Sequence, residues 1–433
     1  MKRLKSLLVV AACLGLALAA APAAGADDHD GSADMGLYVP KPHQHAKRQI
    51  ADLVSSGDKT TAAMVKEMIS TPQAFWVEVT DPAATMRQVR ATVKHAAAKK
   101  QIPVLVAYNI PFRDCAQFSA GGATSVAEYK AWIDGMATGI GDLPAMVILE
   151  PDGLGIIPWY TSIDGVLEWC QPAEANPETA AAERFVMLNY AVDALKAQPN
   201  VSVYLDGTHS GWLNVGDISD RLVKAGVERA DGFYLNASNY QYTANQEQYG
   251  TWISKCIAQG NYAGCANQYW NGGPEGTKIA ELLGPWMGVA LSPYGEWSDD
   301  SDVPELNTSG INARYWAEGD THFVIDTSRN GVGPWLPTVS YPDPQDWCNP
   351  PDRGLGLPPT LETGEALIDA YLWIKTPGES DGECTRGLGP AGETIDPEWD
   401  LIDPGAGDWF PEQVLDLVAN ANPPMAGVWP FKG

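Results

Sequence analysis

Short apolar runs alternate with amphipathic helical segments along this chain of 433 residues. The apolar runs are rich in β-branched and aromatic residues, and they cover 75–77, 104–107, 146–149, 201–205, 232–235, 286–291, 322–325 and 370–374. Helical patterns lie between several of them, at 80–100, 126–140, 180–196 and 218–226. Strands and helices that alternate at this spacing predict an α/β fold with a parallel sheet or barrel, built from roughly seven or eight units.

Residues 1–26 have the pattern of a signal peptide, with three basic residues, an apolar stretch and a small-residue motif that ends at Ala26. We therefore expect a secreted, extracellular protein. No later stretch approaches the ~18 uninterrupted apolar residues of a transmembrane helix, so we expect no membrane partner. Residues 27–433 contain no Ser/Thr/Pro-rich linker and no evident repeat, which favours a single domain.

The formal charge of the chain is −26 at pH 7. An acidic surface of this kind repels nucleic acid and anionic membranes, so we expect neither to be bound. A neutral or cationic partner is favoured.

Six of the seven cysteines follow the predicted leader, and an even number in an exported protein indicates three disulfides. These cysteines are Cys115, Cys170, Cys256, Cys265, Cys348 and Cys384. The residues leave the pairings open, although Cys256 and Cys265 are close enough to close a local loop. No spacing matches a Cys-x-x-Cys motif, and we expect no bound metal.

Ionisable residues gather directly after several predicted strands, at 108–115, 150–152, 204–212, 326–331 and 373–384. Because the carboxyl ends of parallel strands meet at one end of a barrel or edge of a sheet, these clusters should converge. The expected group consists of the carboxylates Asp114, Asp152, Asp206, Glu379 and Asp381, with Arg113, Lys375 and His209 as partial compensation.

Crowded carboxylates cannot all ionise at their ordinary pKa, because each charge raises the pKa of its neighbours. One of them should therefore stay protonated near neutral pH. A protonated acid that faces an ionised one is the pair that hydrolysis of a glycosidic bond requires. Carboxylate clusters also bind divalent metals, so the acids alone leave both chemistries open.

The chain contains 16 tryptophans, and several lie in or beside the long loops expected after the strands. These are Trp76, Trp212, Trp270, Trp335 and Trp347. Indole faces are broad, weakly polar platforms that suit the C–H faces of pyranose rings. For tryptophans beside strand-end acids, sugar stacking is favoured over core packing.

Two strings resemble the signatures of glycoside hydrolase family six, the inverting cellulases. The first is YNIPFRDC at 108–115 with SAGG at 119–122, and the second is VILEPDGL at 147–154. Segments 204–212, 345–349 and 375–381 resemble further parts of the family, so the resemblance covers roughly residues 36–433.

The resemblance implies a distorted seven-stranded β/α barrel with long loops over the C-terminal strand ends. It also implies a catalytic domain over 27–433 that acts on the β-1,4-glucosidic bonds of cellulose and cello-oligosaccharides with inversion. We expect no cofactor and a monomer.

Residue roles follow from the same resemblance. Asp152 would be the general acid, and Asp114 would hold the proton of Asp152 and orient water with the help of Ser119. Tyr108 would crowd the sugar at the cleavage point. Asp381 matches the residue most often discussed as the base, which is disputed in the family and can act through a chain of waters.

The family's sugar-binding positions correspond to Trp76, Asp206, His209, Trp212, Asn236, Asn239, Trp347, Lys375 and Glu379. Cys115–Cys170 and Cys348–Cys384 would be the family's two disulfides, and Cys256–Cys265 would be additional. Where some members carry a second tryptophan shortly after the position of Trp212, this chain has Leu-Asn-Val at 213–215.

Exo-acting members of the family cover the cleft with long loops, and the connections at 153–180, 236–285 and 376–412 resemble loops of that kind. We therefore expect a cellobiohydrolase that releases cellobiose from the non-reducing chain end. An open-cleft endo-1,4-β-glucanase of the same family is the first alternative. A glucan-binding protein without catalysis is the second.

Two further features allow more than one interpretation. Arg329 either binds substrate or neutralises the carboxylate cluster. His43 and His45 could hold a metal, but they lie near the mature N-terminus without acidic or cysteine neighbours, so a solvated surface is favoured.

Overall fold

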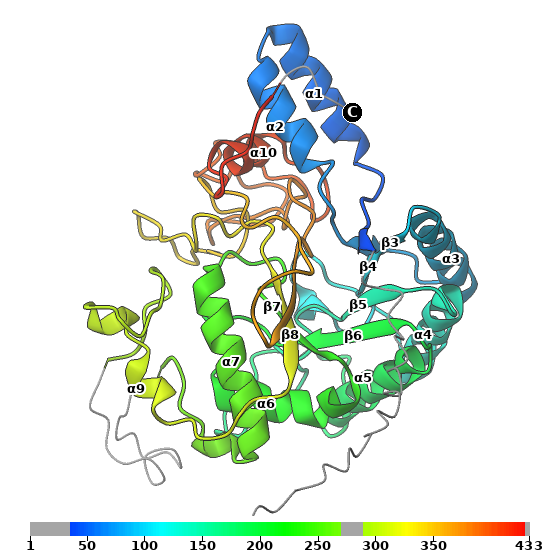
Figure 1. Ribbon diagram of the computed structural model, residues 1–433, viewed down its shortest axis with the longest axis vertical. Helices are drawn as coiled ribbons and strands as arrows, with labels where there is room; N and C mark the ends of the chain where they lie inside the picture. Colours follow the sequence, from blue (N-terminus) through cyan, green and yellow to red (C-terminus); the bar gives the residue numbers. More distant parts are fainter. Residues whose placement is uncertain (1–34, 270–288, 429–433) are drawn as a thin grey trace, which may run out of the picture. The chain divides into compact units, whose positions relative to one another are not determined.

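The computed structural model describes residues 35–269 and 289–428 (Figure 1). The predicted signal peptide, its boundary at residue 26 and Trp270 lie outside these residues.

Seven parallel strands form the main sheet, in the order β2-β4-β5-β6-β7-β8-β9. Their bounds are β2 Phe75–Val77, β4 Val104–Ala107, β5 Ala145–Leu149, β6 Val201–Asp206, β7 Gly232–Leu235, β8 His322–Asp326 and β9 Ile368–Leu372. A separate short pair joins β1, Gly36–Leu37, to β3, Gln101–Ile102. Strand order follows the sequence, as expected when each β–α unit adds its strand beside the previous one.

The sheet curls, so that the chain at its two edges meets. The Ala74 N–H, just before β2, donates to the Trp373 carbonyl just after β9 at 2.8 Å. The indole Nε1–H of Trp76 in β2 donates to the Ile374 carbonyl at 2.9 Å. This arrangement confirms the predicted distorted seven-stranded β/α barrel.

Helices follow most of the strands and surround the sheet (Figure 1). Their bounds are α1 Gln44–Ser56, α2 Lys59–Met68, α3 Pro82–Ala98, α4 Val126–Ile140, α5 Ala180–Lys196, α6 Val215–Lys224, α7 Thr243–Gln259, α9 Ser309–Asn312 and α10 Pro411–Ala419. Local sequence fixes several starts. Asp81 accepts from the Ala84 N–H to cap α3, with Pro82 at the first helical position, and Ser125 accepts from the Glu128 N–H to cap α4.

The core lies between the strands and these helices. All residues of β4 and β5 are buried, as expected for parallel strands covered on both faces. On the helix side, Trp132 and Ile133 of α4 and Trp252 of α7 belong to the same buried cluster. A second cluster joins α1, α2 and α10 to Trp373 and Trp409, and Figure 1 shows these three helices together.

Three sequence expectations need correction. Residues 243–259 form α7, so this part of the predicted loop at 236–285 is a helix of the β7–α7–β8 unit. Residues 289–291 form no strand, and the rest of the run predicted at 286–291 lies outside the described residues. Trp335 is buried beneath the loops, with the Arg386 guanidinium 5.0 Å from its ring centroid, so it packs rather than presenting a sugar platform.

None of the helices in the described part of the chain is both long enough and apolar enough to cross a membrane.

Candidate active site

A cleft of about 700 Å³ opens over the C-terminal ends of the strands. Its floor includes residues that follow β4, β5, β7 and β9, and its walls come from the long loops. Several floor residues have positive φ although they are not glycine, among them Asp114 at 59° and Asp152 at 61°. Such backbone conformations persist where the surroundings hold them, and they cluster at functional sites.

Most of the residues predicted for the site line this cleft. They are Trp76, Tyr108, Asp114, Ser119, Asp152, His209, Trp212, Asn239, Trp347, Lys375, Glu379 and Asp381. Asp206 and Asn236, both predicted to bind sugar, do not line it.

Asp152 follows β5 and lies in a strongly negative environment. Burial raises its pKa well above the ordinary range, and the charges of Asp206, Asp114 and Asp381 raise it further. Burial also raises the pKa of Asp114, to about 6, although a backbone N–H from Ser119 at 2.6 Å stabilises the ionised form. Asp152 is thus the group in this cleft best suited to carry a proton at mildly acidic to neutral pH.

Glu150, two residues before Asp152, binds backbone groups of a neighbouring loop. Its Oε2 accepts from the backbone N–H groups of Asn109 and Ile110, each at 2.9 Å. Burial raises the pKa of Glu150 to about 7, with these backbone hydrogen bonds opposing the rise. The side chain is fully buried, so it joins the loop after β4 to the loop after β5 and fixes the spacing of the acids above.

Tyr108 and Trp76 form one aromatic wall. Their rings meet edge to face, with centroids 5.5 Å apart. The guanidinium of Arg113 lies 4.7 Å from the Tyr108 ring centroid and also donates to the Tyr108 carbonyl at 2.5 Å. Burial raises the pKa of Tyr108 well above its usual value, and the charges of Asp152 and Asp114 add to the rise, so the phenol stays neutral.

Asp381 is held as an ionised carboxylate. The Arg329 guanidinium donates to both of its oxygens at 2.9 Å, and Oδ2 also accepts from the Tyr240 hydroxyl at 2.9 Å and the Asn349 N–H at 3.0 Å. Burial opposes ionisation, but Arg329 and Lys375 lower the pKa of Asp381 below its usual value. Arg329 is fully buried and does not line the cleft, so of its two predicted roles the structure favours neutralisation.

Lys375 and Glu379 lie beside Asp381 in the loop after β9. The Lys375 ammonium donates to the Ser380 carbonyl at 3.0 Å and is 3.6 Å from Asp381 Oδ1. Burial raises the pKa of Glu379 to about 7, Lys375 opposes the rise, and Glu78 adds to it. This end of the cleft therefore offers hydrogen-bond donors and acceptors for sugar hydroxyls.

Trp212 is supported from below by the loop after β5. A Cβ on Gly155 would lie 2.4 Å from the Trp212 ring, so the contact requires glycine. Asp206 holds this loop, because its Oδ2 accepts from the Leu154 and Gly155 N–H groups at 3.0 Å each. The sugar contact predicted for Asp206 is therefore not supported: the carboxylate is buried and bonded to backbone.

His209 lies next to Trp212, with ring centroids 5.7 Å apart. Its Nδ1 accepts from the Gly211 N–H at 3.2 Å, and burial lowers the pKa of His209 to about 3. The imidazole is therefore neutral, with Nε2 as the donor.

Asn236 is also displaced from its predicted role. It is fully buried, and its amide donates to the Asp326 carbonyl at 2.9 Å and accepts from the Gln241 N–H at 3.0 Å. These bonds shape the turn after β7. Its neighbour Asn239 is the residue of this turn that reaches the cleft as predicted.

The three predicted disulfides are present: Cys115–Cys170 and Cys348–Cys384, which the family resemblance implied, and the additional Cys256–Cys265. The first fixes the residue after Asp114 to the loop after β5. The third joins the turn that carries Trp347 to the loop that carries Asp381.

Several cleft residues escaped the sequence analysis. Trp169, Tyr240, Tyr294 and Glu78 all line the cleft. Two of them could have been predicted from their positions in the sequence. Glu78 directly follows β2, and Trp169 directly precedes a disulfide cysteine. Trp169 is 53% exposed, which leaves much of its ring free for a ligand.

Among residues 35–269 and 289–428, no three His, Cys, Asp or Glu side chains are grouped as a metal site would require.

Comparison with known proteins places these features in context. The sequence model described as Glycosyl hydrolases family 6 matches residues 32–421. Endoglucanase A of Cellulomonas fimi is 31% identical over 363 residues, which cover 84% of this chain and 57% of that protein. This chain thus spans little more than half the length of that relative.

This chain is also similar to a protein named as a cellobiohydrolase and to an endoglucanase of solved structure. The probable 1,4-β-D-glucan cellobiohydrolase C of Aspergillus niger is 30% identical over 381 residues, which cover 81% of this chain and 69% of that protein. The endoglucanase Cel6 of Mycobacterium tuberculosis was solved in complex with a methyl-cellobiosyl-4-deoxy-4-thio-β-D-cellobioside. It matches 90% of this chain and 98% of its own, with 30% identity and a TM-score of 0.61.

Proposed function

This chain belongs to the glycosyl hydrolases of family 6, and we propose that it hydrolyses the β-1,4-glucosidic bonds of cellulose and cello-oligosaccharides with inversion. The observation that carries the proposal is the contrast between two acids of one cleft. The pKa of Asp152 is raised well above its ordinary range, whereas that of Asp381 is lowered. Acids with pKa values moved apart in this way suit the roles of proton donor and anion.

In the proposed reaction, Asp152 donates its proton to the glycosidic oxygen as the bond breaks. The ionised Asp114 and Asp381 stabilise the positive charge that develops on the sugar ring. A water attacks the opposite face of the ring and passes a proton toward Asp381. Since donors already fill Oδ2 of Asp381, its Oδ1 is the oxygen that accepts from this water. The Tyr108 and Trp76 wall holds the ring on the side away from the leaving group.

We further propose that the enzyme is secreted, acts as a monomer and attacks cellulose from the non-reducing chain end to release cellobiose. Residues of two long loops support an enclosed cleft: Ile156 and Trp169 from the loop after β5, and Ala406 and Gly407 from the loop after β9. The endo-acting alternative is favoured by the names of two similar proteins, from Cellulomonas fimi and Mycobacterium tuberculosis.

The test of the chemistry is cellobiose release from insoluble cellulose by the purified wild type and by Asp152→Ala. General acid catalysis contributes roughly 10²- to 10⁴-fold, so the variant should lose most of its turnover. It should keep its affinity for cello-oligosaccharides. No release by the wild type would leave the glucan-binding protein as the better description.

A further inference from the structure

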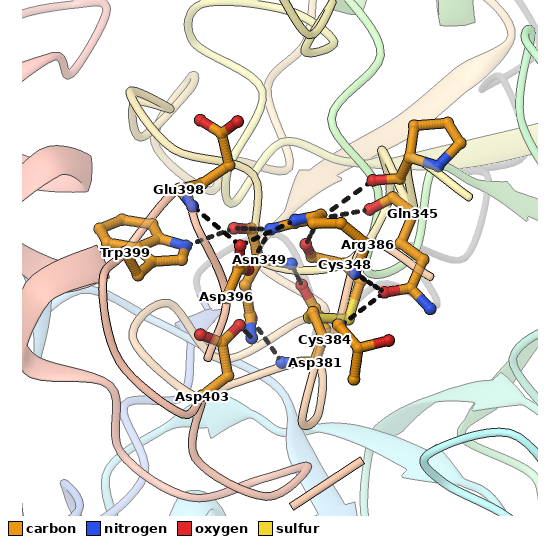
Figure 2. Close-up of polar contacts among 12 residues, drawn as sticks. Gln345, Cys348, Asn349, Asp381, Cys384, Arg386, Asp396, Glu398, Trp399 and Asp403 are labelled. Carbon is orange, nitrogen blue, oxygen red and sulfur yellow. Dashed lines mark hydrogen bonds and ion pairs between the residues drawn. A yellow bond between two sulfur atoms is a disulfide. The ribbon is translucent and has the colours of Figure 1, made fainter. Parts of the chain in front are cut away.

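We propose that Asn349 is a positioning residue for Asp381, and that the buried ion pair between Arg386 and Asp396 holds Asn349 in place. This inference rests on the proposed function, since it concerns the reaction in the same cleft. None of these three residues lines the cleft. They come from loops behind Asp381, where Figure 2 shows them joined by continuous polar contacts.

Asn349 binds both the main chain and the carboxylate of Asp381. Its Oδ1 accepts from the Asp381 N–H at 2.8 Å, and its Nδ2 donates to Ser380 Oγ and to the Gly382 carbonyl at 2.9 Å each. The backbone N–H of Asn349 donates to Asp381 Oδ2 at 3.0 Å. One fully buried side chain thus fixes the residues on either side of Asp381.

Arg386 in turn binds the turn that carries Asn349. Its Nη1 donates to the carbonyls of Gln345 at 2.8 Å and Cys348 at 2.7 Å, and its Nη2 donates to the Asn349 carbonyl at 3.1 Å. The guanidinium also contacts both oxygens of Asp396, at 3.1 and 2.6 Å. Arg386 and Asp396 are both fully buried, so each depends on the other for charge compensation.

The backbone of Asn349 is held by further contacts. Its φ is +40°, in the left-handed region that asparagine adopts more readily than most other residues. Trp399 Nε1–H donates to the Asn349 carbonyl at 2.7 Å, and Asp403 Oδ2 lies 2.8 Å from Asn349 Nδ2, whose two hydrogens it shares with the acceptors named above. The Cys348–Cys384 disulfide already joins the two loops. The hydrogen bonds therefore add orientation to a connection that exists without them.

The orientation decides which oxygen of Asp381 meets water. Arg329, Tyr240 and Asn349 all donate to Oδ2. Oδ1 has the Arg329 Nη2 contact at 2.9 Å and Lys375 at 3.6 Å. A rotated carboxylate would exchange these environments, and misplacement of a reacting group by about 1 Å can cost roughly 10²-fold in rate.

The first experiment compares Asn349→Ala with the wild type on soluble cello-oligosaccharides. We expect kcat to fall roughly ten- to hundredfold while KM changes less than about threefold. We also expect the acidic limb of the pH profile to move to higher pH, because an Asp381 that loses its alignment with Arg329 and Asn349 is less well stabilised as an anion. Unchanged kcat and an unchanged pH profile would overturn the inference.

The matched control is Asn189→Ala. This asparagine of α5 also bridges two segments, by donating to the Phe185 and Lys224 carbonyls, but it lies outside the cleft. Its replacement should lower the melting temperature without changing kcat or the pH profile. An equal loss of kcat in Asn189→Ala would mean that the effect of Asn349→Ala is general destabilisation, and the inference would be wrong.

Trp399→Phe keeps the test decisive if Asn349→Ala does not fold. It removes one donor to the Asn349 carbonyl. We expect kcat to fall about two- to fivefold, which is the size of effect that the loss of one hydrogen bond gives. A crystal structure of either variant provides a readout that does not need turnover. The Asp381 carboxylate should leave its two-point contact with Arg329, and an unmoved carboxylate would contradict the inference. An inactive wild type would instead contradict the proposed function.

Discussion

At the scale of single residues, the aspartates of the cleft differ in protonation although their side chains are chemically identical. Asp152, Asp114 and Asp381 are all aspartates that follow strand ends and line one cleft, yet their surroundings differ. Burial raises the pKa of all three, but Arg329 and Lys375 outweigh it at Asp381, whereas only the Ser119 N–H and Arg113 oppose it at Asp114. At Asp152 burial raises the pKa, and the negative charges of Asp206, Asp114 and Asp381 raise it further. The placement of donors, more than burial itself, therefore separates anion from acid.

A pH prediction follows for Asp114→Asn. The charge of Asp114 raises the pKa of Asp152, so removing that charge should lower it. The general acid is active only when protonated, and activity is lost as pH rises through its pKa. The alkaline limb of kcat/KM should therefore move to lower pH in the variant. An alkaline limb that stays in place, or moves to higher pH, would show that Asp114 does not control the proton of Asp152.

Stability offers a separate check on Asp114. Its folded pKa of about 6 lies above the value of ~3.9 expected for an unfolded chain. The folded state therefore binds more protons between these values, and this group's contribution to stability falls as pH rises from about 4 to about 6. Asp114→Asn lacks this ionisable group. The difference in melting temperature, variant minus wild type, should therefore increase as pH rises across the same interval.

At the scale of elements, the strands supply a rigid base and the loops supply specificity. The loop between β5 and α5 is the clearest example, since it contributes Asp152, supports Trp212 through Gly155 and presents Trp169. Arg221 of α6 holds it from below by donating to the Leu154 carbonyl at 2.8 Å and pairing with Glu168. The parts of the loop next to Trp212 and Trp169 are therefore held in place before substrate binds.

We predict that Trp169→Ala weakens binding of long cello-oligosaccharides. Loss of one stacking face is worth roughly 1 kcal/mol, or about a fivefold rise in KM, with kcat unchanged. Trp316→Ala is the matched control, because Trp316 is 78% exposed and does not line the cleft. Equal KM values for the two variants would remove Trp169 from the binding surface.

The disulfides should differ in their effect on stability. Cys115–Cys170 spans 55 residues of sequence and Cys256–Cys265 spans 9. On chain-entropy grounds, replacing the first pair with serine should lower the free energy of unfolding by roughly 4 kcal/mol, and replacing the second by roughly 3 kcal/mol. Urea unfolding of the two double variants measures the difference. A larger loss from the shorter loop would contradict the entropic explanation.

Sequence patterns predicted the elements better than the directions of side chains. The apolar runs identified all seven strands of the sheet, because buried parallel strands are continuous and hydrophobic. Strand ends also located Asp114, Asp152 and Asp381. The same rule did not hold for Asp206, the last residue of β6, whose carboxylate turns toward backbone N–H groups of the loop after β5. The sugar contact that the family resemblance implied for Asn236 is not supported either, because its side chain bonds to backbone groups.

The run at 286–291 shows the opposite error. It has the composition of a strand, yet its described residues form none. A short apolar run cannot by itself distinguish a strand from a buried loop, since partners far along the chain decide whether a ladder forms. The helix α7 was missed because it lies within the stretch 236–285, which was interpreted as one long loop.

At the scale of the whole molecule, net charge and cleft geometry act together. A chain of charge −26 gains nothing from charge attraction to the proposed substrate cellulose, which is neutral. Affinity must therefore come from stacking and hydrogen bonds within the cleft. Under the proposed exo action, the cleft would keep such contacts on a single glucan chain from one cut to the next.

We predict from the proposed exo action that reducing ends appear mainly in the soluble fraction when insoluble cellulose is digested. The viscosity of carboxymethyl cellulose should fall slowly relative to the number of bonds cut, because cuts near chain ends barely shorten the polymer. Asp152→Ala gives the baseline for both measurements. A rapid loss of viscosity would identify the enzyme as endo-acting.

The seam between β2 and β9 has a consequence for how the protein is made. Trp76, from the first strand of the sheet to be synthesised, bonds to the Ile374 carbonyl, almost 300 residues later. Until residue 374 has been synthesised, β2 can pair with β4 on one side, but this bond on its other side cannot form. The seam cannot close on a truncated chain, so partial translation products should lack this wall of the cleft.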